Sequence, residues 1–453
     1  MQTEAPPLPT VAPVPAPLAS GRHSDLNELP DAFLVELLLR HFFRLGVLPL
    51  FQISQRLGLV RQRAEALLRQ MRDLHLVEVP RRGEFEGDVS YALTELGQLQ
   101  AKLAFEKCQY VGPAPVTLHE YASKVRDQST HLQPTNAQQL KTAVGDLVID
   151  ESLLPSLGSA LNSGKAIYFY GPSGSGKTYL AEHLVKTLQG HIWVPHAIYV
   201  DGEVIQVFDP RVHRVVEPSA LPERGLSRHA PQDARWVRTE RPVVITGGEL
   251  TLQMLELEFD TLSRLYVAPA QMKANNGIFV VDDLGRQRIS PRELLNRWIV
   301  PLDRHVDYLG LHTGGKLKVP FDVTVIFLSN LAPEELTDPA FSRRLGYKFL
   351  IGEISRTGYR EVVAQACQRV GVTFDAEAAD FLVDQLHPSF SQPYLPCIPY
   401  DVISKIRDRA LYMGEPVHLS PALLTWAWKL YFGTGDPVPQ AADQSKKLEE
   451  YQK

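Results

Sequence analysis

The segment Gly171-Pro-Ser-Gly-Ser-Gly-Lys-Thr178 constrains this chain more than any other part of its sequence. An apolar run, Ala166–Tyr170, precedes the segment, and a helical pattern, Leu180–Val185, follows it. Glycines let the backbone turn tightly enough to direct several N–H groups at a phosphate, and the following helix adds the positive end of its dipole. The motif therefore predicts a phosphate-binding loop in an α/β fold with a parallel sheet.

This loop predicts a nucleotide site in which each residue type has a physical role. We expect ATP to be held by Gly171, Gly174, Ser175, Gly176, Lys177 and Thr178. The Lys177 ammonium suits the β- and γ-phosphates, and the Thr178 hydroxyl suits Mg²⁺. An idle glycine-rich turn would not require a strand before the loop and a helix after it.

A second pair of carboxylates is expected beside this loop, because a bound magnesium ion and an attacking water both need oxygen partners. The apolar run Gly277–Val281 is followed directly by Asp282 and Asp283. We expect Asp282 to complete the magnesium shell through water and Asp283 to orient the attacking water. An aspartate at this second place reaches one methylene less far than a glutamate would.

These motifs together resemble the AAA+ ATPase family over about residues 140–433. Val323–Ser329, followed by Asn330, is similar to the sensor 1 strand, so the resemblance assigns Asn330 to positioning the water. Asp338–Arg344 resembles the segment that bears the arginine finger, with Arg344 as first choice and Arg343 as the alternative. The resemblance implies a homo-oligomeric ring, a hexamer, that hydrolyses ATP to ADP and phosphate and remodels a protein client.

Two further segments bear on this resemblance. The family's sensor 2 arginine is missing, because Ile398-Pro-Tyr-Asp401 stands at its expected place and Arg407 and Arg409 lie two or more turns further on. Residues 307–311 and 316–319 are expected to form a hairpin before the sensor 1 strand, either as a substrate-contacting lever or as a plain extension of a sheet.

Changes in composition and pattern divide the chain into several expected parts. These are a disordered proline-rich tail (1–26), a domain that resembles a winged helix-turn-helix domain (27–108), a linker (109–136), a core that resembles the AAA+ core (137–352) with a β-rich insertion at about 201–276, a helical lid (353–433) and a C-terminal tail (434–453). The fold class expected is thus an α/β P-loop core with a parallel sheet and a helical lid, preceded by an α+β domain.

The sequence of the α+β domain is compatible with two kinds of binding partner, DNA and protein. Its third expected helix carries four arginines that suit DNA phosphates or guanine edges, namely Arg61, Arg63, Arg69 and Arg72. The expected wing carries Glu84, Glu86 and Asp88, which a phosphate backbone would repel. A DNA-associated ATPase therefore remains the alternative to an ATPase that docks on a protein.

The composition of the whole chain limits the cellular compartments in which we expect the protein. A formal net charge of −5 gives no general attraction to nucleic acid or to acidic membranes. The three cysteines, Cys108, Cys367 and Cys397, are scattered and odd in number, which fits a reducing compartment and not a disulfide framework. With no apolar run long enough to span a membrane and no secretory signal pattern, the sequence predicts a cytoplasmic location and no membrane span.

Overall fold

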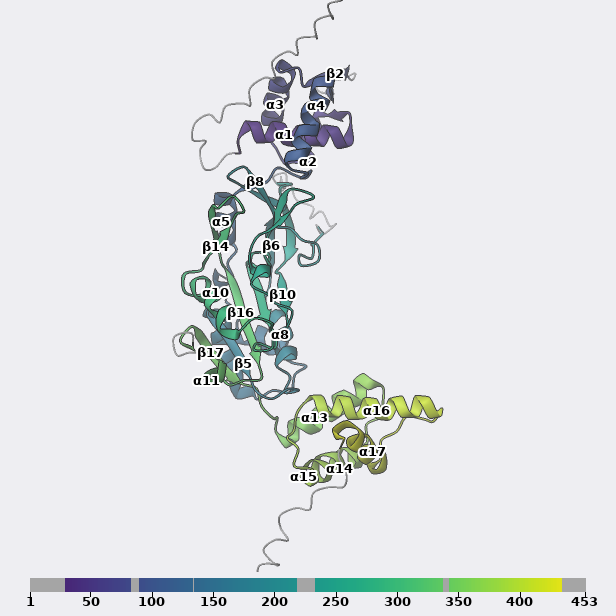
Figure 1. Ribbon diagram of the computed structural model, residues 1–453. Coiled ribbons are helices and arrows are strands. Elements are labelled where there is room, and N and C mark those ends of the chain that lie inside the picture. The colour runs from purple at the N-terminus through teal and green to yellow at the C-terminus, as the bar shows by residue number, and fades with distance from the viewer. Residues whose placement is uncertain (1–28, 83–88, 133, 218–232, 337–341, 434–453) are drawn as a thin grey trace, which may run out of the picture.

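The computed structural model describes residues 29–82, 89–132, 134–217, 233–336 and 342–433. The expected tails at 1–26 and 434–453 and the wing residues Glu84, Glu86 and Asp88 lie outside the described residues. In Figure 1 the N-terminal helices lie at one end of the molecule and the C-terminal helices at the other, with the β-rich part and the parallel sheet between them.

The N-terminal part combines helices with short strands, as an α+β domain does. Its elements are α1 (Asp31–Leu45), β1 (Leu48–Pro49), α2 (Leu50–Leu57), α3 (Arg61–Asp73), β2 (Val77–Arg82), β3 (Val89–Leu93) and α4 (Glu95–Lys107). Helix α2 ends at Gly58, whose φ of 67° is a left-handed conformation that glycine adopts without steric cost. The strands pair in the order β1-β3-β2, and β1 is too short for the sequence pattern to indicate.

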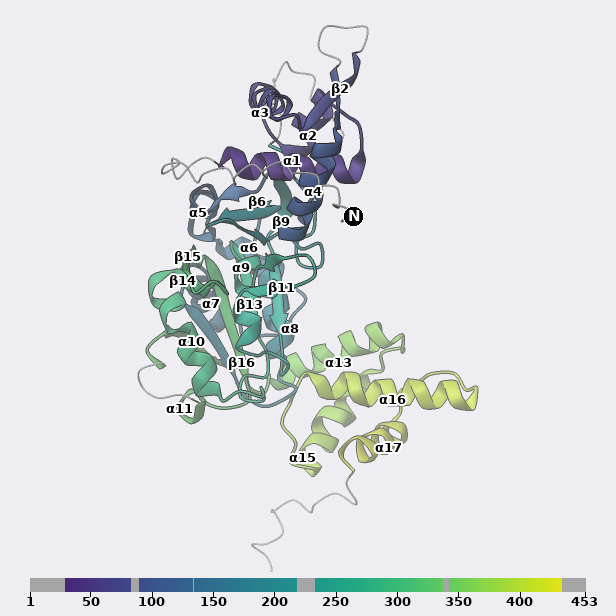
Figure 2. The same ribbon diagram turned by 45° about the horizontal axis from the view of Figure 1, so that its top comes forward.

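The core of this N-terminal part continues into the β-rich part of the chain. Phe33 and Phe42 of α1 belong to one buried apolar cluster that also contains Val204 and Leu265. The rings of Phe33 and Tyr199 lie 4.4 Å apart between centroids. Figure 2 shows α1 lying across this end of the β-rich part. Apolar burial therefore joins the two parts directly.

The segment expected as a linker, 109–136, is folded instead. It contains β4 (Val116–Thr117) and α5 (Leu118–Asp127), and it leads through a 3₁₀ turn to α6 (Ala137–Ala143). Thr117 and Glu120 form a capping box that fixes the start of α5. Tyr121 and Val125 are each 3% exposed and pack into the core of the β-rich part. The expectation of a linker is wrong because two buried side chains a turn apart are a weak signal in a polar segment.

Five parallel strands form the central sheet, in the order β10-β13-β16-β5-β17. Their bounds are Val243–Thr246 (β10), Gly277–Val281 (β13), Val323–Ser329 (β16), Ala166–Tyr170 (β5) and Leu345–Leu350 (β17). Helices that follow or precede these strands are α7 (Leu154–Asn162), α8 (Lys177–Val185), α9 (Ala270–Lys273), α10 (Pro291–Arg304) and α11 (Pro333–Leu336). The carboxyl ends of parallel strands meet at one edge, where ligands bind in open α/β sheets. This sheet confirms the expected α/β P-loop fold class.

A β-rich part lies between this sheet and the N-terminal helices. It contains a five-stranded sheet in the order β11-β12-β8-β7-β4 and two antiparallel pairs, β6 with β9 and β14 with β15. The strands not yet given are β6 (His191–Pro195), β7 (Ala197–Val200), β8 (Glu203–Gln206), β9 (Trp236–Glu240), β11 (Glu258–Asp260), β12 (Leu265–Val267), β14 (Val306–Gly310) and β15 (Lys316–Pro320). The β14–β15 pair confirms the expected hairpin.

The range expected for the β-rich insertion, 201–276, needs correction at both ends. Strands β4, β6 and β7 of this part precede residue 201. Val243–Thr246, which the sequence places in the insertion, is the edge strand β10 of the central parallel sheet. Strand propensity indicates that a segment is extended, but the choice of partner strand depends on contacts far away in the sequence.

The C-terminal part is helical, as expected. Its helices are α13 (Arg356–Val370), α14 (Ala376–Phe381), a π-helical turn (Leu382–Leu386), α15 (His387–Ser389), α16 (Cys397–Met413) and α17 (Pro421–Phe432). They share a core that includes Tyr359, Ile403 and Trp428. Within the described ranges, no helix is both long and apolar enough to cross a membrane.

Candidate nucleotide-binding site

The phosphate loop connects the end of β5 to the start of α8, at the carboxyl edge of the central sheet. Two of its glycines hold positions that no other residue fits. Gly171 has a φ of 142°, and a Cβ there would lie 2.2 Å from the carbonyl oxygen of Ile351. Gly174 has a φ of 82°, and a Cβ there would lie 2.3 Å from Sγ of Cys397. The loop is therefore tight enough to bring its backbone close to a ligand.

Lys177 is buried, with an exposed fraction of 8%, and it uses all three ammonium donors. Its Nζ donates to the carbonyl oxygens of Gly171 at 2.9 Å and Pro172 at 2.8 Å, and to Oδ1 of Asn330 at 2.9 Å. Burial lowers the pKa of Lys177, while the nearby carboxylates of Asp282 and Asp283 act in the opposite direction. These neutral acceptors hold the charge in place, and phosphate oxygens can replace the two carbonyls as partners.

The predicted magnesium residues lie together beside this lysine. Thr178 Oγ1 donates a hydrogen bond of 2.8 Å to Oδ2 of Asp282, across 104 positions of sequence. The other carboxylate oxygen of Asp282 accepts from the backbone N–H of Asp283 at 2.7 Å. The Asp283 side chain is exposed, and its backbone has a φ of 51°. Asp283 thus stands at the turn that follows β13, with its carboxylate open to solvent.

Polar contacts that the sequence analysis did not assign hold these loops together. Gln287 donates through Nε2 to the carbonyl of Asp282 at 3.0 Å and accepts from the N–H of Gly285 at 2.9 Å. Ser329 donates to the carbonyl of Leu284 at 2.7 Å. The backbone N–H of Asp282 donates to the carbonyl of Thr246 at 2.7 Å. These contacts depend on pairing between strands, so no local signal could have indicated them.

A pocket beside the phosphate loop was also not predicted. It lies between Asp146–Ile149 from the segment before β5, Tyr179 of α8, and the lid residues Val362, Pro396 and Tyr400. Apolar and aromatic side chains dominate this lining, which suits the flat base of a nucleotide. More than 200 positions separate residues 146–149 from Val362 and its neighbours in the lid, so only the tertiary structure brings them together.

The two arginines expected as the arginine finger are not part of this chain's own core. Arg343 is exposed. Arg344 is partly buried and donates from Nε to Oδ2 of Asp303 in α10 at 2.8 Å. Residues 337–341 of the expected finger segment lie outside the described residues.

The missing sensor 2 arginine has no close substitute on α16. Tyr400 lines the pocket described above, and the guanidinium of Arg369 lies 5.5 Å from its ring centroid. Arg407 donates to Asp408, and Arg409 lies 3.7 Å from a carboxylate oxygen of Glu415. The lid side of the pocket therefore presents an aromatic side chain at the position where the sequence resemblance led us to look for a cation.

The four arginines of α3 differ in how they are engaged. Arg61 pairs with Glu65 at 2.8 Å, and Arg63 pairs with Asp31. Arg69 donates to the carbonyl of Glu65 at 3.4 Å. For Arg72, no ion pair is present within the described residues. Two of the four charges are thus balanced by carboxylates of the same chain.

Comparisons with known proteins cover parts of this chain. A protein family described as a domain of unknown function (DUF8689) matches residues 355–430, within the helical lid. No match is found among proteins of curated function. Among solved structures, NtrX from Brucella abortus is similar, with 14% identity and a TM-score of 0.39 over 79% of this chain and 64% of that chain. The match thus spans less than two thirds of NtrX.

A second similar structure is the Holliday junction branch migration motor RuvB of Thermotoga maritima. It is 13% identical, with a TM-score of 0.37 over 66% of this chain and 73% of that chain. A point mutant of the same protein is 12% identical, with a TM-score of 0.34 over 66% of this chain and 72% of that chain. At this level of similarity, the α/β P-loop fold class follows from the strand order and the phosphate loop of the present chain itself.

Proposed function

We propose that this protein is a magnesium-dependent ATPase of the AAA+ type that hydrolyses ATP to ADP and phosphate. One observation carries the proposal, namely the polar cluster at the carboxyl edge of the sheet. Lys177 bonds to Asn330 at 2.9 Å, and Thr178 bonds to Asp282 at 2.8 Å. These residues come from three different strand ends, and a structural turn would have no need of all four.

The residues present fit both ATP and Mg²⁺. Ser175 Oγ is buried and has no hydrogen-bond partner among the described residues, so a phosphate oxygen would satisfy it. Thr178 and Asp282 offer hydroxyl and carboxylate oxygens, the donor types that Mg²⁺ prefers. When bound, the ion neutralises charge on the phosphate oxygens. The pocket between Ile149 and Tyr400 would take the base.

We assign the remaining steps of the proposed hydrolysis to residues of this chain. Lys177 holds the terminal phosphates through charge and hydrogen bonds. Asp283, exposed beside Asp282, would hold the attacking water and accept its proton. Asn330 is kept next to Lys177 and would fix the position of that water. Because Asp283 has a short side chain, we expect turnover to be slow compared with a glutamate at this place.

We further propose that the protein works as a homo-oligomeric ring, a hexamer, acting on a protein client. The exposed position of Arg343, and the partly exposed pair of Arg344 with Asp303, support delivery of a guanidinium to a neighbouring site. A guanidinium at a phosphoryl-transfer site raises the rate of hydrolysis about a thousandfold or more. Hydrolysis would then depend on the position of the neighbouring subunit.

A protein client is favoured over DNA. Arg61 pairs with Glu65 and Arg63 with Asp31, so carboxylates of the same chain already offset half of the positive charge that α3 would offer to a phosphate backbone. The free thiols of Cys108, Cys367 and Cys397 agree with the expected reducing compartment, the cytoplasm. Adding duplex DNA to the turnover assay separates the two alternatives, because only the DNA-associated ATPase would be stimulated.

The proposal is tested by measuring phosphate release at rising protein concentration. The rate per chain should rise with assembly, and Lys177→Ala should lower turnover at least about 100-fold because the terminal phosphates lose their charged partner. Lys186→Ala, which changes an exposed lysine after the same helix, is the matched control and should keep its activity. Arg344→Ala should lower turnover about a thousandfold and should also inhibit when mixed with the unmodified chain.

Two results would contradict the proposal. If Lys177→Ala retained full turnover, the phosphate loop would not be the site. A rate per chain that stays constant down to a concentration at which the protein is shown to be a monomer would exclude catalysis between subunits.

A further inference from the structure

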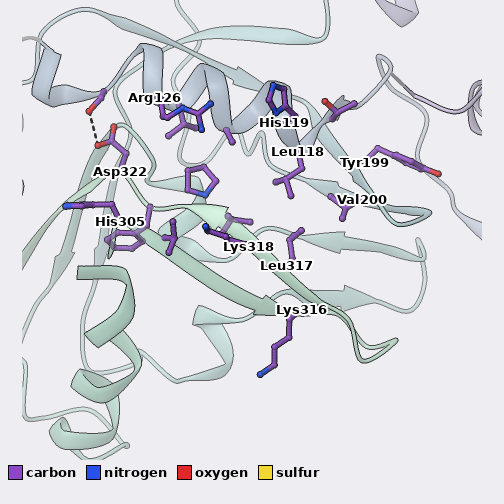
Figure 3. Close-up of a pocket in the computed structure, with 18 of the residues that line it drawn as sticks. Leu118, His119, Arg126, Tyr199, Val200, His305, Lys316, Leu317, Lys318 and Asp322 are labelled. Atoms are coloured by element: carbon purple, nitrogen blue, oxygen red, sulfur yellow. Dashed lines mark hydrogen bonds between the residues drawn. The ribbon is translucent and has the colours of Figure 1, made fainter. Parts of the chain in front are cut away.

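A large groove lies far from the phosphate loop, between α5 and strand β15. Figure 3 shows Leu118, His119 and Arg126 of α5 on one side of it and Lys318 of the hairpin on the other. The groove has a volume of about 980 Å³ and extends to the turn between β7 and β8. This size is at the upper limit for small-molecule pockets and leaves room for a segment of polypeptide.

Strand β15 presents an open backbone edge to this groove. It pairs only with β14, in a two-stranded sheet of the described residues. The N–H of Phe321 donates to the carbonyl of His305, and the N–H of Leu311 donates to that of Gly315. Since hydrogen-bonded pairs alternate in an antiparallel ladder, these two bonds place the N–H and C=O groups of Lys316 and Lys318 on the outer edge.

The outer edge of β15 has few partners of its own. Within the described residues, the outward N–H and C=O groups of Lys316 and Lys318 make no hydrogen bond. The next outward group, the carbonyl of Pro320, accepts from Nδ2 of Asn275 at 3.1 Å, which closes the edge at that end. The edge therefore offers two donors and two acceptors in alternation, the pattern that an added β-strand satisfies.

The groove also carries an excess of positive charge. Arg126, Lys316 and Lys318 are exposed, and no carboxylate pairs with them in the described part of the chain. Of the two carboxylates that line the groove, Asp322 already accepts hydrogen bonds from Ser129 and Asn276. Asp201 stands at the turn after β7. The charge of the groove is therefore complementary to an acidic ligand.

The lining favours a peptide over a nucleic acid. Val125, Leu317 and Val319 are buried at the base of the groove and suit apolar side chains. The aromatic rings that line it are not free for stacking on bases, because Phe321 is 2% exposed and Tyr199 packs on Phe33. Single-stranded nucleic acid binds largely through such stacking. Its phosphate backbone carries no N–H donor, whereas the backbone of an extended peptide supplies the regular alternation of N–H and C=O groups that a strand edge requires.

We propose that an extended acidic segment of a partner protein binds in this groove as an added strand on the outer edge of β15. Its backbone pairs with Lys316 and Lys318, alternate acidic side chains face the lysines and Arg126, and the apolar side chains between them face Leu317 and Val319. This binding is independent of the proposed ATPase activity, because the edge and its charges are present without nucleotide.

The charge component is tested with the full chain and an end-blocked, fluorescein-labelled hexapeptide of alternating glutamate and valine. Fluorescence anisotropy, measured without nucleotide, should show binding that Lys316→Glu with Lys318→Glu weakens about tenfold or more, since two attractive pairs become repulsive. The matched control is Lys102→Glu with Lys141→Glu, which reverses two exposed charges outside the groove and should leave the affinity unchanged.

The backbone component is tested by two substitutions at one position. Lys318→Val removes the charge and keeps the outward N–H, whereas Lys318→Pro removes both and leaves the ladder to β14 intact. The proline variant should bind about fivefold more weakly than the valine variant, the value of one hydrogen bond. Thermal melting of both variants checks that the chain stays folded.

Three outcomes would overturn the proposal. Equal affinities of Lys318→Val and Lys318→Pro would show that the peptide does not use the strand edge. An unchanged affinity after reversal of both lysines would remove the charge argument. If a single-stranded oligonucleotide of equal charge bound more tightly and lost affinity with the same substitutions, the groove would be a nucleic-acid site. A variant without turnover, Lys177→Ala, should bind the peptide normally, so failure of the ATPase proposal is distinguished from failure of this one.

Discussion

The two sides of the proposed nucleotide pocket are lined by different kinds of side chain. On the core side, Lys177, Thr178, Asp282 and Asn330 are tied together by hydrogen bonds of 2.8 to 2.9 Å. On the lid side, Pro396 and Tyr400 line the pocket, and the described helices supply no arginine to its lining. The difference supports the proposal that the core supplies the charged and polar groups for chemistry, whereas the lid contributes shape and burial. Lid movement would then respond to packing at the pocket and less to the charge of the γ-phosphate.

The largest predicted effect is a loss of turnover after a substitution on the core side of the pocket. Asp283→Asn keeps the size of the side chain but removes its ability to accept a proton, so turnover should fall about 100- to 1,000-fold. Binding of ATP should change little, because Lys177 and Asp282 remain. The measurement is phosphate release together with ATP affinity from a fluorescent nucleotide analogue.

Asp127→Asn is the control for this substitution, since it neutralises an exposed carboxylate at the end of α5. If Asp283→Asn retained near-normal turnover, the attacking water would be held by another group, and the core side would need a new assignment.

A second prediction concerns the contact between the two sides, where Gly174 meets the lid. Gly174→Ala would place a Cβ 2.3 Å from Sγ of Cys397 and force alanine to a φ of 82°. The left-handed backbone costs about 1–2 kcal/mol, and the displaced lid adds to this, so ATP affinity should fall about tenfold or more. Calorimetric titration with ATP measures the change.

The added substitution Cys397→Ala should separate the two causes. It removes the clash but not the backbone strain, so Gly174→Ala with Cys397→Ala should recover part of the lost affinity. Adding Cys108→Ala instead, at a cysteine in the N-terminal part, should recover none. Equal affinities of the single variant and the Cys397 double variant would show that lid contact does not matter for binding.

The smallest predicted effect concerns the lid alone. His387 is 1% exposed, and burial lowers its pKa from 6.5 to about 4. Its Nε2 lies 2.6 Å from the Tyr359 hydroxyl, and its Nδ1 lies 3.1 Å from the carbonyl of Gln392, which fits the neutral ring.

The sign of the pH dependence follows from this shift. A histidine whose pKa is lower in the folded state adds stability that is complete above 6.5 and is lost as the pH falls toward 4. At pH 5 the lid should have lost about 2 kcal/mol of unfolding free energy. Urea unfolding measures this loss when tryptophan fluorescence is followed in a variant that keeps Trp426 and Trp428 of the lid and carries phenylalanine in place of Trp193, Trp236 and Trp298. His387→Gln should remove this pH dependence of the unfolding free energy, whereas His418→Gln, at an exposed histidine, should keep it. An unchanged pH profile for His387→Gln would show that another group causes the dependence.

The sequence predicted the parts of the site whose signals are local. The phosphate loop, Asp282 and Asn330 each follow an apolar strand, and because parallel strands align their carboxyl ends, their proximity could be expected. The hairpin β14–β15 was also predicted from a local signal, because two short strand-like segments flank Gly314 and Gly315. The finger role of Arg343 and Arg344 stays a prediction, since it concerns a neighbouring subunit.

Other parts could not be predicted because their partners lie far away in the sequence. Helix α5 was expected as linker, since only Tyr121 and Val125 are buried and their partners are strands more than 60 positions further on. Strand β10 was assigned to an insertion, although it pairs with β13 in the central sheet. Gln287 gave no local signal, because it acts through contacts with another loop. Tyr400 was noted only as standing in place of the sensor 2 arginine, and its place in the pocket depends on contacts between the lid and the core.

The amino-acid order alone therefore determined the α/β class, the phosphate loop and the identity of its carboxylate partner, since glycine conformation and the alternation of strands and helices are local properties. The tertiary structure alone decided which strand stands beside which, what lines the base pocket and which backbone edge stays open. These depend on apolar burial and hydrogen bonding between distant segments, which no short stretch of sequence specifies.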